Sequence, residues 1–267
     1  MSKFSNVFKK ILILIIVFAN ISSICFAAWW GTPGYEWSFS KGLTPIMTQK
    51  AMSKTVGQED FYAILLRYLK YKNVDKNRTV IQTQGSTKNM NSALIGMMNE
   101  INDYINQATL TPNQYRQVIT YINHAEKTVE KQQAFLNKTE IKSFYLYLSL
   151  AKYKAAMLLN DSTYRLQEMA NHRNVKYSEI LEYGIEPYYG NVSRGEFLVL
   201  MFSLLSNQKI SKDEILKQYK GAGVLVGYET GDMLDKELTY SEMFTFLYRF
   251  EIFEFNPENE EVDKEQN

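Results

Sequence analysis

The apolar positions of this chain recur mainly at helical spacing. Long stretches carry apolar residues at i, i+3, i+4 and i+7, whereas the alternating pattern of a half-buried strand is scarce and the whole chain has only five prolines. A helix that packs on a core buries one such stripe. The periodicity therefore predicts a mainly α fold.

The middle of the chain, residues 76–165, predicts three helices joined by short connections. Ser86 can cap the first helix, Thr111 begins a capping box with a proline at the first helical position, and the third helix starts near Asn137. The third helix is apolar nearly all round, which is typical of a central position. Short connections favour antiparallel neighbours, so we expect an inserted antiparallel three-helix segment.

On either side of this segment, three stretches share one pattern. Each has helix-compatible residues, then a Gly followed by an aliphatic residue, a variable loop, and a capped apolar helix. A Gly just past one helix and a capping residue before the next are the usual boundaries of paired helices. We therefore expect three helix-loop-helix units that pack together, covering residues 28–75, 166–208 and 209–255.

These units resemble the S-layer homology (SLH) family. The third unit has a Gly227-Tyr228 turn, a Gly231-Asp232 loop, and Thr239-Tyr240-Ser241-Glu242 where the family has a Thr-Arg-Ala-Glu-like helix start. The second unit is similar at Ser193-Arg194-Gly195-Glu196, and the first, with Gln58, keeps only the spacing. The resemblance leaves out the inserted helices. It implies a pseudo-threefold helical prism that anchors a bacterial surface protein to wall glycopolymer.

The motif residues at the helix starts predict capping boxes. The pairs are Ser193 with Glu196 and Thr239 with Glu242. In each pair the hydroxyl is expected to accept a hydrogen bond from the main-chain amide of the third helical residue, and the carboxylate to accept one from the main-chain amide of the capping residue. Arg194, at the first helical position between them, stands where unpaired N–H groups and the helix dipole favour anions. Its guanidinium can hold a carboxylate or phosphate with two hydrogen bonds, although a solvated surface arginine is the alternative interpretation.

In the SLH family the equivalent arginine contacts an acidic, often pyruvylated, sugar, so the resemblance implies that role for Arg194. Gln58 and Tyr240 occupy the corresponding positions of the first and third units. Gln58 can donate a neutral hydrogen bond and Tyr240 can stack on a sugar face, but neither neutralises an anion. We expect one strong acidic-sugar site at Arg194 and weaker contacts at the other two.

Residues 1–27 have the layout of a secretory signal peptide. Basic residues precede an apolar run that begins at Ile11 and softens to small residues ending at Ala27, after which we expect cleavage. An uncleaved anchor over 11–28 and a lipidated Cys25 are the alternatives. Cleavage leaves no cysteine, with 27 basic and 29 acidic residues. An exported protein without disulfides suits the surface of a Gram-positive-type cell.

Composition limits the chemistry and the partners. The full chain has 30 basic and 29 acidic residues, so it has no strongly basic field and nucleic acid is not expected as a partner. One cysteine and two histidines leave little for a zinc site or a nucleophilic triad, and HExxH, GxSxG and phosphate-loop motifs are absent from the sequence. We expect no metal, no cofactor, no catalytic residue and no enzyme activity.

Acidic residues keep one enzymatic alternative open, because glycoside hydrolysis needs only two suitably spaced carboxylates. The acids of the middle helices fall between the apolar stripes, which favours a solvated face. They are Glu100, Asp103, Glu126 and Glu130.

Aromatic and acidic residues mark the ends of the mature chain. Trp37 is expected to pack in the core, whereas Trp29 and Trp30 are left open between packing and a carbohydrate surface. Residues 256–267 predict a disordered acidic tail.

Together these features predict a secreted protein that attaches to the bacterial wall, its partner being a secondary cell-wall polymer or a peptidoglycan-linked glycan. One alternative is a wall-modifying enzyme that uses carboxylates of the middle helices. The other is a helical scaffold whose inserted helices bind a protein partner.

Overall fold

The computed structural model describes residues 31–76, 92–134, 136–221, 224–225 and 234–252. Within these ranges the chain forms helices and no β-strand, which confirms the mainly α fold. The expected signal peptide, Ser86, Trp29, Trp30 and the acidic tail lie outside the described residues. No helix in the described part of the chain is long and apolar enough to cross a membrane.

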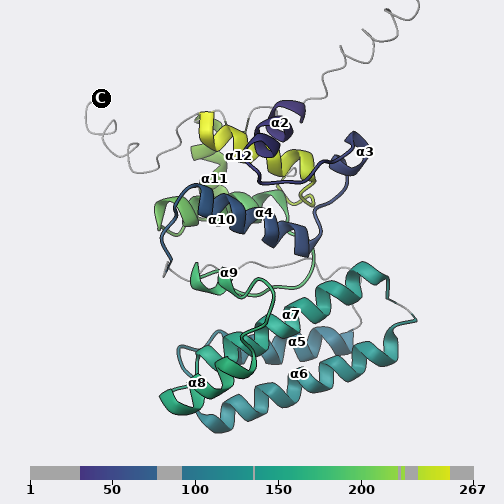
Figure 1. The fold of residues 1–267 in the computed structure, drawn as a ribbon, viewed down its shortest axis with the longest axis vertical. Helices are drawn as coiled ribbons and strands as arrows, with labels where there is room; N and C mark the ends of the chain where they lie inside the picture. Colours follow the sequence, from purple (N-terminus) through teal and green to yellow (C-terminus); the bar gives the residue numbers. More distant parts are fainter. Residues whose placement is uncertain (1–30, 77–91, 135, 222–223, 226–233, 253–267) are drawn as a thin grey trace, which may run out of the picture.

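The helices form two groups (Figure 1). One group holds the helices before and after the insertion, and the other holds the inserted helices. The first comprises α2 (Thr32–Ser40), α3 (Gln49–Met52), α4 (Gln58–Tyr71), α10 (Arg194–Ser206), α11 (Lys212–Gly221) and α12 (Tyr240–Ile252). The second comprises α5 (Ser92–Ile105), α6 (Pro112–Gln132), α7 (Lys138–Met157) and α8 (Ser162–Asn171), and the short α9 (Glu179–Glu182) lies between the groups.

Two helix starts predicted for the insertion are confirmed. Thr111 accepts the amide of Gln114 at 3.3 Å, and its own amide donates to the Gln114 side chain at 2.9 Å. Asn137 and Glu140 form the same reciprocal pair, with both hydrogen bonds at 2.9 Å. These local bonds satisfy amides that the first helical turn leaves unpaired, so the sequence pattern alone locates these starts.

The insertion contains a fourth helix that the sequence pattern did not predict. The Asp161 carboxylate caps α8 by accepting the amide of Tyr164 at 2.9 Å. None of the α8 residues is fully buried, although the helix packs against α7 with Tyr164 and Met169 partly buried. The expected boundary between residues 165 and 166 falls inside α8.

The first two units share the geometry of their Gly-aliphatic turn. Gly42 and Gly184 adopt φ angles of 68° and 75°, a left-handed conformation that favours glycine. In each unit the next amide reaches back five residues, from Leu43 to the Ser38 carbonyl at 2.9 Å and from Ile185 to the carbonyl of Ile180 at 3.2 Å. The chain therefore leaves α2 and α9 by the same turn. Gly223 of the third unit lies outside the described residues.

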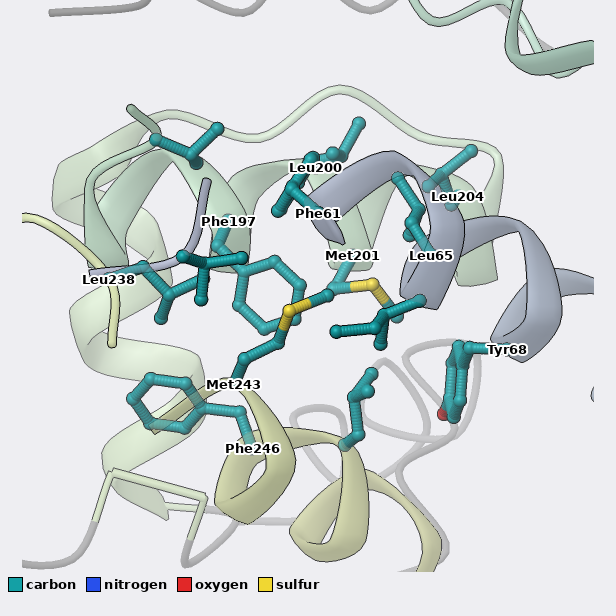
Figure 2. Packing of buried hydrophobic residues seen from close by; sticks show 14 of the residues in the cluster. Phe61, Leu65, Tyr68, Phe197, Leu200, Met201, Leu204, Leu238, Met243 and Phe246 are labelled. Carbon is teal, nitrogen blue, oxygen red and sulfur yellow. The ribbon is translucent and has the colours of Figure 1, made fainter. Parts of the chain in front are cut away.

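The second helices of the three units, α4, α10 and α12, bury equivalent positions in one core, although α4 begins after Gly57 and has no side-chain cap. Phe61, Phe197 and Met243 are the fourth residues of these helices, and each is at most 1 % exposed. Figure 2 shows the three side chains converging from different helices, and the ring centres of Phe61 and Phe197 lie 6.0 Å apart. One apolar cluster therefore holds together the segment before the insertion and the two segments after it.

Helix α7 belongs to both cores, as its all-round apolar sequence predicts. Leu146 and Leu150 pack in the cluster of α4, α10 and α12, whereas Phe144 and Leu148 pack with α5 and α6. The insertion is thus connected to the repeat units through a buried helix as well as through the chain.

Candidate functional site

The capping boxes at the starts of α10 and α12 are confirmed. The Ser193 amide donates to the Glu196 carboxylate at 2.8 Å, and the Glu196 amide donates to the Ser193 hydroxyl at 3.2 Å. The Thr239 amide donates to Glu242 Oε2 at 2.9 Å, and the Glu242 amide returns to the Thr239 hydroxyl at 3.4 Å. Each capping pair stabilises its helix by about 1 kcal/mol.

The residues at the first helical positions are buried and contact a neighbouring unit. Arg194 of the second unit forms an ion pair with Glu242 of the third, and the Tyr240 hydroxyl of the third donates to Asp60 of the first. The Gln58 amide of the first donates to the main-chain carbonyl of Tyr188 in the second. The contacts therefore run from first to second, second to third, and third to first.

Main-chain hydrogen bonds reinforce this ring on two sides. The amide of Val56 donates to the carbonyl of Leu238 at 2.9 Å, and the amide of Leu238 donates to the carbonyl of Val192 at the same distance. The Arg194 amide donates to the Lys236 carbonyl at 3.0 Å. The segment before α12 thus lies between the segments before α4 and α10 and pairs with both.

These contacts correct the expected sugar site. Arg194 and Tyr240 are 9 % exposed and Gln58 is 1 % exposed, so none of the three presents an open ligand surface. The Arg194 guanidinium lies against the Glu242 carboxylate, and an anionic sugar there would have to displace a buried ion pair. Sequence reasoning assigned Glu242 to its capping role alone and missed that its second oxygen serves Arg194.

Electrostatics at Tyr240 agree with a structural role. Burial raises the pKa of the Tyr240 phenol, and the Asp60 carboxylate, which accepts a hydrogen bond from it, raises the pKa further. The phenol therefore stays neutral and acts as a donor to Asp60. Its hydroxyl is committed to closing the ring between the third and first units.

The described part of the chain has two further concave sites, one where the insertion meets the start of α4 and one between helices of the insertion. The first, which we call the junction groove, has a volume of about 480 Å³. Its walls come from α7, from the chain after α8 and from the start of α4, and they include Lys142, Tyr145, Leu146, Asn174, Lys176 and Glu59. No sequence motif marked this groove, because its residues come from three separate segments.

The second site, the α6–α8 pocket, has a volume of about 520 Å³ and holds a polar cluster. The Tyr115 hydroxyl donates to Glu168 at 2.7 Å and lies 3.4 Å from Nε2 of His172. Nearby, Lys152 forms an ion pair with Glu126 at 2.8 Å. His172 also lines the junction groove, so one side chain separates the two sites.

Burial sets the protonation of this cluster. Burial lowers the pKa of His172 and outweighs the Glu168 carboxylate, which raises that pKa. The Lys152 ammonium lowers the pKa of His172 further. Burial and Glu168 together raise the pKa of the Tyr115 phenol. A neutral imidazole and a neutral phenol therefore face one carboxylate at neutral pH.

The lowered pKa of His172 predicts a stability that falls as the pH falls. Below the ordinary histidine pKa of about 6.5, the unfolded chain binds a proton that the folded imidazole resists, so acidification favours unfolding. We expect His172→Gln, which cannot take the proton, to lose less unfolding free energy than the wild type between pH 7.5 and pH 5.5. Urea denaturation at both values measures this difference.

The matched control is His124→Gln, since His124 is exposed on α6. Its pH dependence should follow that of the wild type. An equal pH dependence in the wild type and His172→Gln would contradict the burial of a neutral imidazole in this pocket.

The structure also places Trp37 and the four acidic residues named for the middle helices. Trp37 packs against Tyr71 and Tyr248, with ring centres 6.0 Å away in each case, so its predicted packing role is confirmed. Glu100, Asp103 and Glu130 are exposed, and Glu126 is half-buried beside Lys152. Within the described ranges no group of His, Cys, Asp or Glu could hold a metal ion.

Comparison of the chain with family models, with curated proteins and with solved structures gave no match.

Proposed function

We propose that this chain is a secreted, non-enzymatic protein that attaches non-covalently to a glycopolymer of the bacterial wall, and that its three units form an SLH-like pseudo-threefold prism. The observation that carries the proposal is the cyclic order of contacts among the helix starts. Contacts that lead from each unit to the next close into a ring only if the units surround a common axis. Arg194, Tyr240 and Gln58 hold this ring together in the proposed prism.

The common core supports the same arrangement. Phe61, Phe197 and Met243 occupy equivalent positions in α4, α10 and α12 and meet in one cluster. Related modules that bury equivalent faces against each other are stable only together, as in other repeat architectures. The first unit, whose motif is the weakest in sequence, supplies its full share of this core.

Wall attachment is tested with purified sacculi. The exported protein should sediment with intact sacculi and remain in solution with sacculi from which the secondary polymer has been removed. Equal retention on both preparations, or on neither, contradicts the proposal. Loss of turbidity during the incubation would instead support a wall-modifying enzyme.

The pocket chemistry argues against that enzyme. Glu168 is the one carboxylate among the residues that line the α6–α8 pocket, and it already accepts a hydrogen bond from Tyr115. Glycoside hydrolysis by the usual mechanisms requires two carboxyl groups across the scissile bond. We therefore propose no catalytic role for this pocket.

A scaffold that binds a protein partner is the second candidate. It is favoured by the burial of all three first-position residues, which leaves the repeats as a packing unit and the insertion as the part with open concave surface. Retention on neither sacculus preparation would favour this candidate over wall attachment.

A further inference from the structure

We propose that the junction groove binds a short saccharide that carries an anionic group; this inference rests on the proposed wall attachment and names its contact site. The groove lies where α7 of the insertion meets the start of α4 and the chain after α8. It is therefore formed only when the insertion and the repeat units are packed together. Its volume of about 480 Å³ is within the range of small-ligand sites, about 300–1,000 Å³.

The α7 side of the groove offers an aromatic and apolar surface. Tyr145 is half-buried, so part of its ring remains open to the groove, and Leu146 is buried beside it. The hydroxyl of Ser149 donates to the Tyr145 carbonyl at 2.7 Å, a bond within α7. An aromatic ring on a rigid helix is a suitable platform for the apolar face of a sugar ring, because little side-chain freedom is lost on contact.

The end of α8 and the chain after it supply polar groups that can serve sugar hydroxyl and acetamido substituents. Asn171 and Asn174 are exposed at the groove, and each amide can both donate and accept hydrogen bonds. The half-buried His172, which lines both sites, adds a ring nitrogen. A stacking surface combined with amide groups fits a saccharide better than a purely apolar ligand.

The charges in the groove favour an anion. Lys176 lies 3.7 Å from Glu59, and its ammonium also lies over the Tyr177 ring at 4.8 Å. Lys142 lines the groove from α7, as Tyr145 does, and its side chain is exposed. With two lysines and one glutamate on its walls, the groove has an excess of positive charge to balance an acidic substituent.

The ring of helix starts is a poorer candidate for the same ligand. There the guanidinium of Arg194, the amide of Gln58 and the hydroxyl of Tyr240 already bind protein groups. The polar groups of the junction groove, in contrast, include exposed amides and an exposed ammonium that a ligand can reach without breaking a buried contact. The physical cost of binding is therefore lower in the groove.

The test uses the acidic polysaccharide released from sacculi by hydrofluoric acid, with a neutral N-acetylglucosamine tetramer as the comparison probe. Calorimetry is performed with the purified exported protein and with Tyr145→Ala, Lys142→Met and Lys127→Met. Lys127 is exposed on α6 and is the control for loss of one lysine from the insertion. Urea denaturation of each variant checks that its stability is kept.

We expect Tyr145→Ala to weaken binding of the acidic polysaccharide about tenfold. Lys142→Met should weaken it about threefold at low salt, with a smaller difference at 0.5 M NaCl because salt screens the charge. Lys127→Met should bind like the wild type, and the neutral tetramer should bind more weakly than the acidic probe.

Different outcomes separate this inference from the proposed function. If the wild type binds intact sacculi and both groove variants bind the polysaccharide with unchanged affinity, the groove assignment is wrong while wall attachment stands. If the neutral tetramer binds as well as the acidic probe, the anionic character of the ligand is wrong. If the wild type binds neither sacculi nor polysaccharide, the proposed function is wrong and the inference falls with it.

Discussion

Arg194→Ala is expected to lower the free energy of unfolding by about 3–5 kcal/mol. The side chains of Arg194 and Glu242 are only 11 % and 4 % exposed, so the substitution leaves a buried carboxylate without its cationic partner. Glu242 keeps its capping bonds to Thr239, which reduces the loss but does not replace the guanidinium. Urea denaturation followed by circular dichroism measures the change.

Two further variants distinguish the ion pair from a general effect of losing an arginine. Arg173→Ala, at an exposed position after α8, should change stability by less than about 0.5 kcal/mol. Arg194→Met combined with Glu242→Gln removes both charges and keeps an amide that can cap Thr239, so it should recover much of the loss. A stable Arg194→Ala protein with weakened binding to sacculi would instead restore Arg194 as the sugar contact.

Gly34→Ala is expected to destabilise the fold by about 1–3 kcal/mol or more. A Cβ atom at Gly34 would lie 2.7 Å from the Thr245 nitrogen and 2.8 Å from the carbonyl carbon and oxygen of Phe244. These are main-chain atoms of α12, so α2 would have to move away from it, and no rotamer change relieves the clash. A shift of the urea midpoint to lower concentration at unchanged slope measures the effect.

Gly96→Ala is the matched control for this substitution. Gly96 is exposed in the interior of α5, and an added Cβ would meet no atom within 4 Å. Because alanine is the better helix former, this variant should gain up to about 1 kcal/mol. A Gly34→Ala protein as stable as Gly96→Ala would show that α2 does not pack closely on α12.

Both predictions concern contacts that sequence reasoning did not assign. Arg194 pairs with Glu242 of another unit, and Gly34 of α2 lies against the main chain of Phe244 and Thr245 in α12. No local pattern connects such residues, because their proximity depends on how the helices pack. The sequence therefore predicted that Arg194 binds an external ligand, because its partner Glu242 lies on another unit.

The sequence by itself determined the helical class, the capping boxes at Thr111, Ser193 and Thr239, the helix start near Asn137, and the central place of α7. Each depends on a hydrogen bond within one turn or on the distribution of apolar residues around one helix, and both are local properties. It did not predict α8, a short helix that buries no residue fully.

Only the tertiary structure decided which side chains face solvent and which face another segment. It turned Arg194, Tyr240 and Gln58 into buried contacts between units, and it brought parts of α4, α7 and the chain after α8 together around one groove. The physical reason is that burial and pairing depend on the positions of distant segments, whereas helix starts and apolar stripes depend on near neighbours.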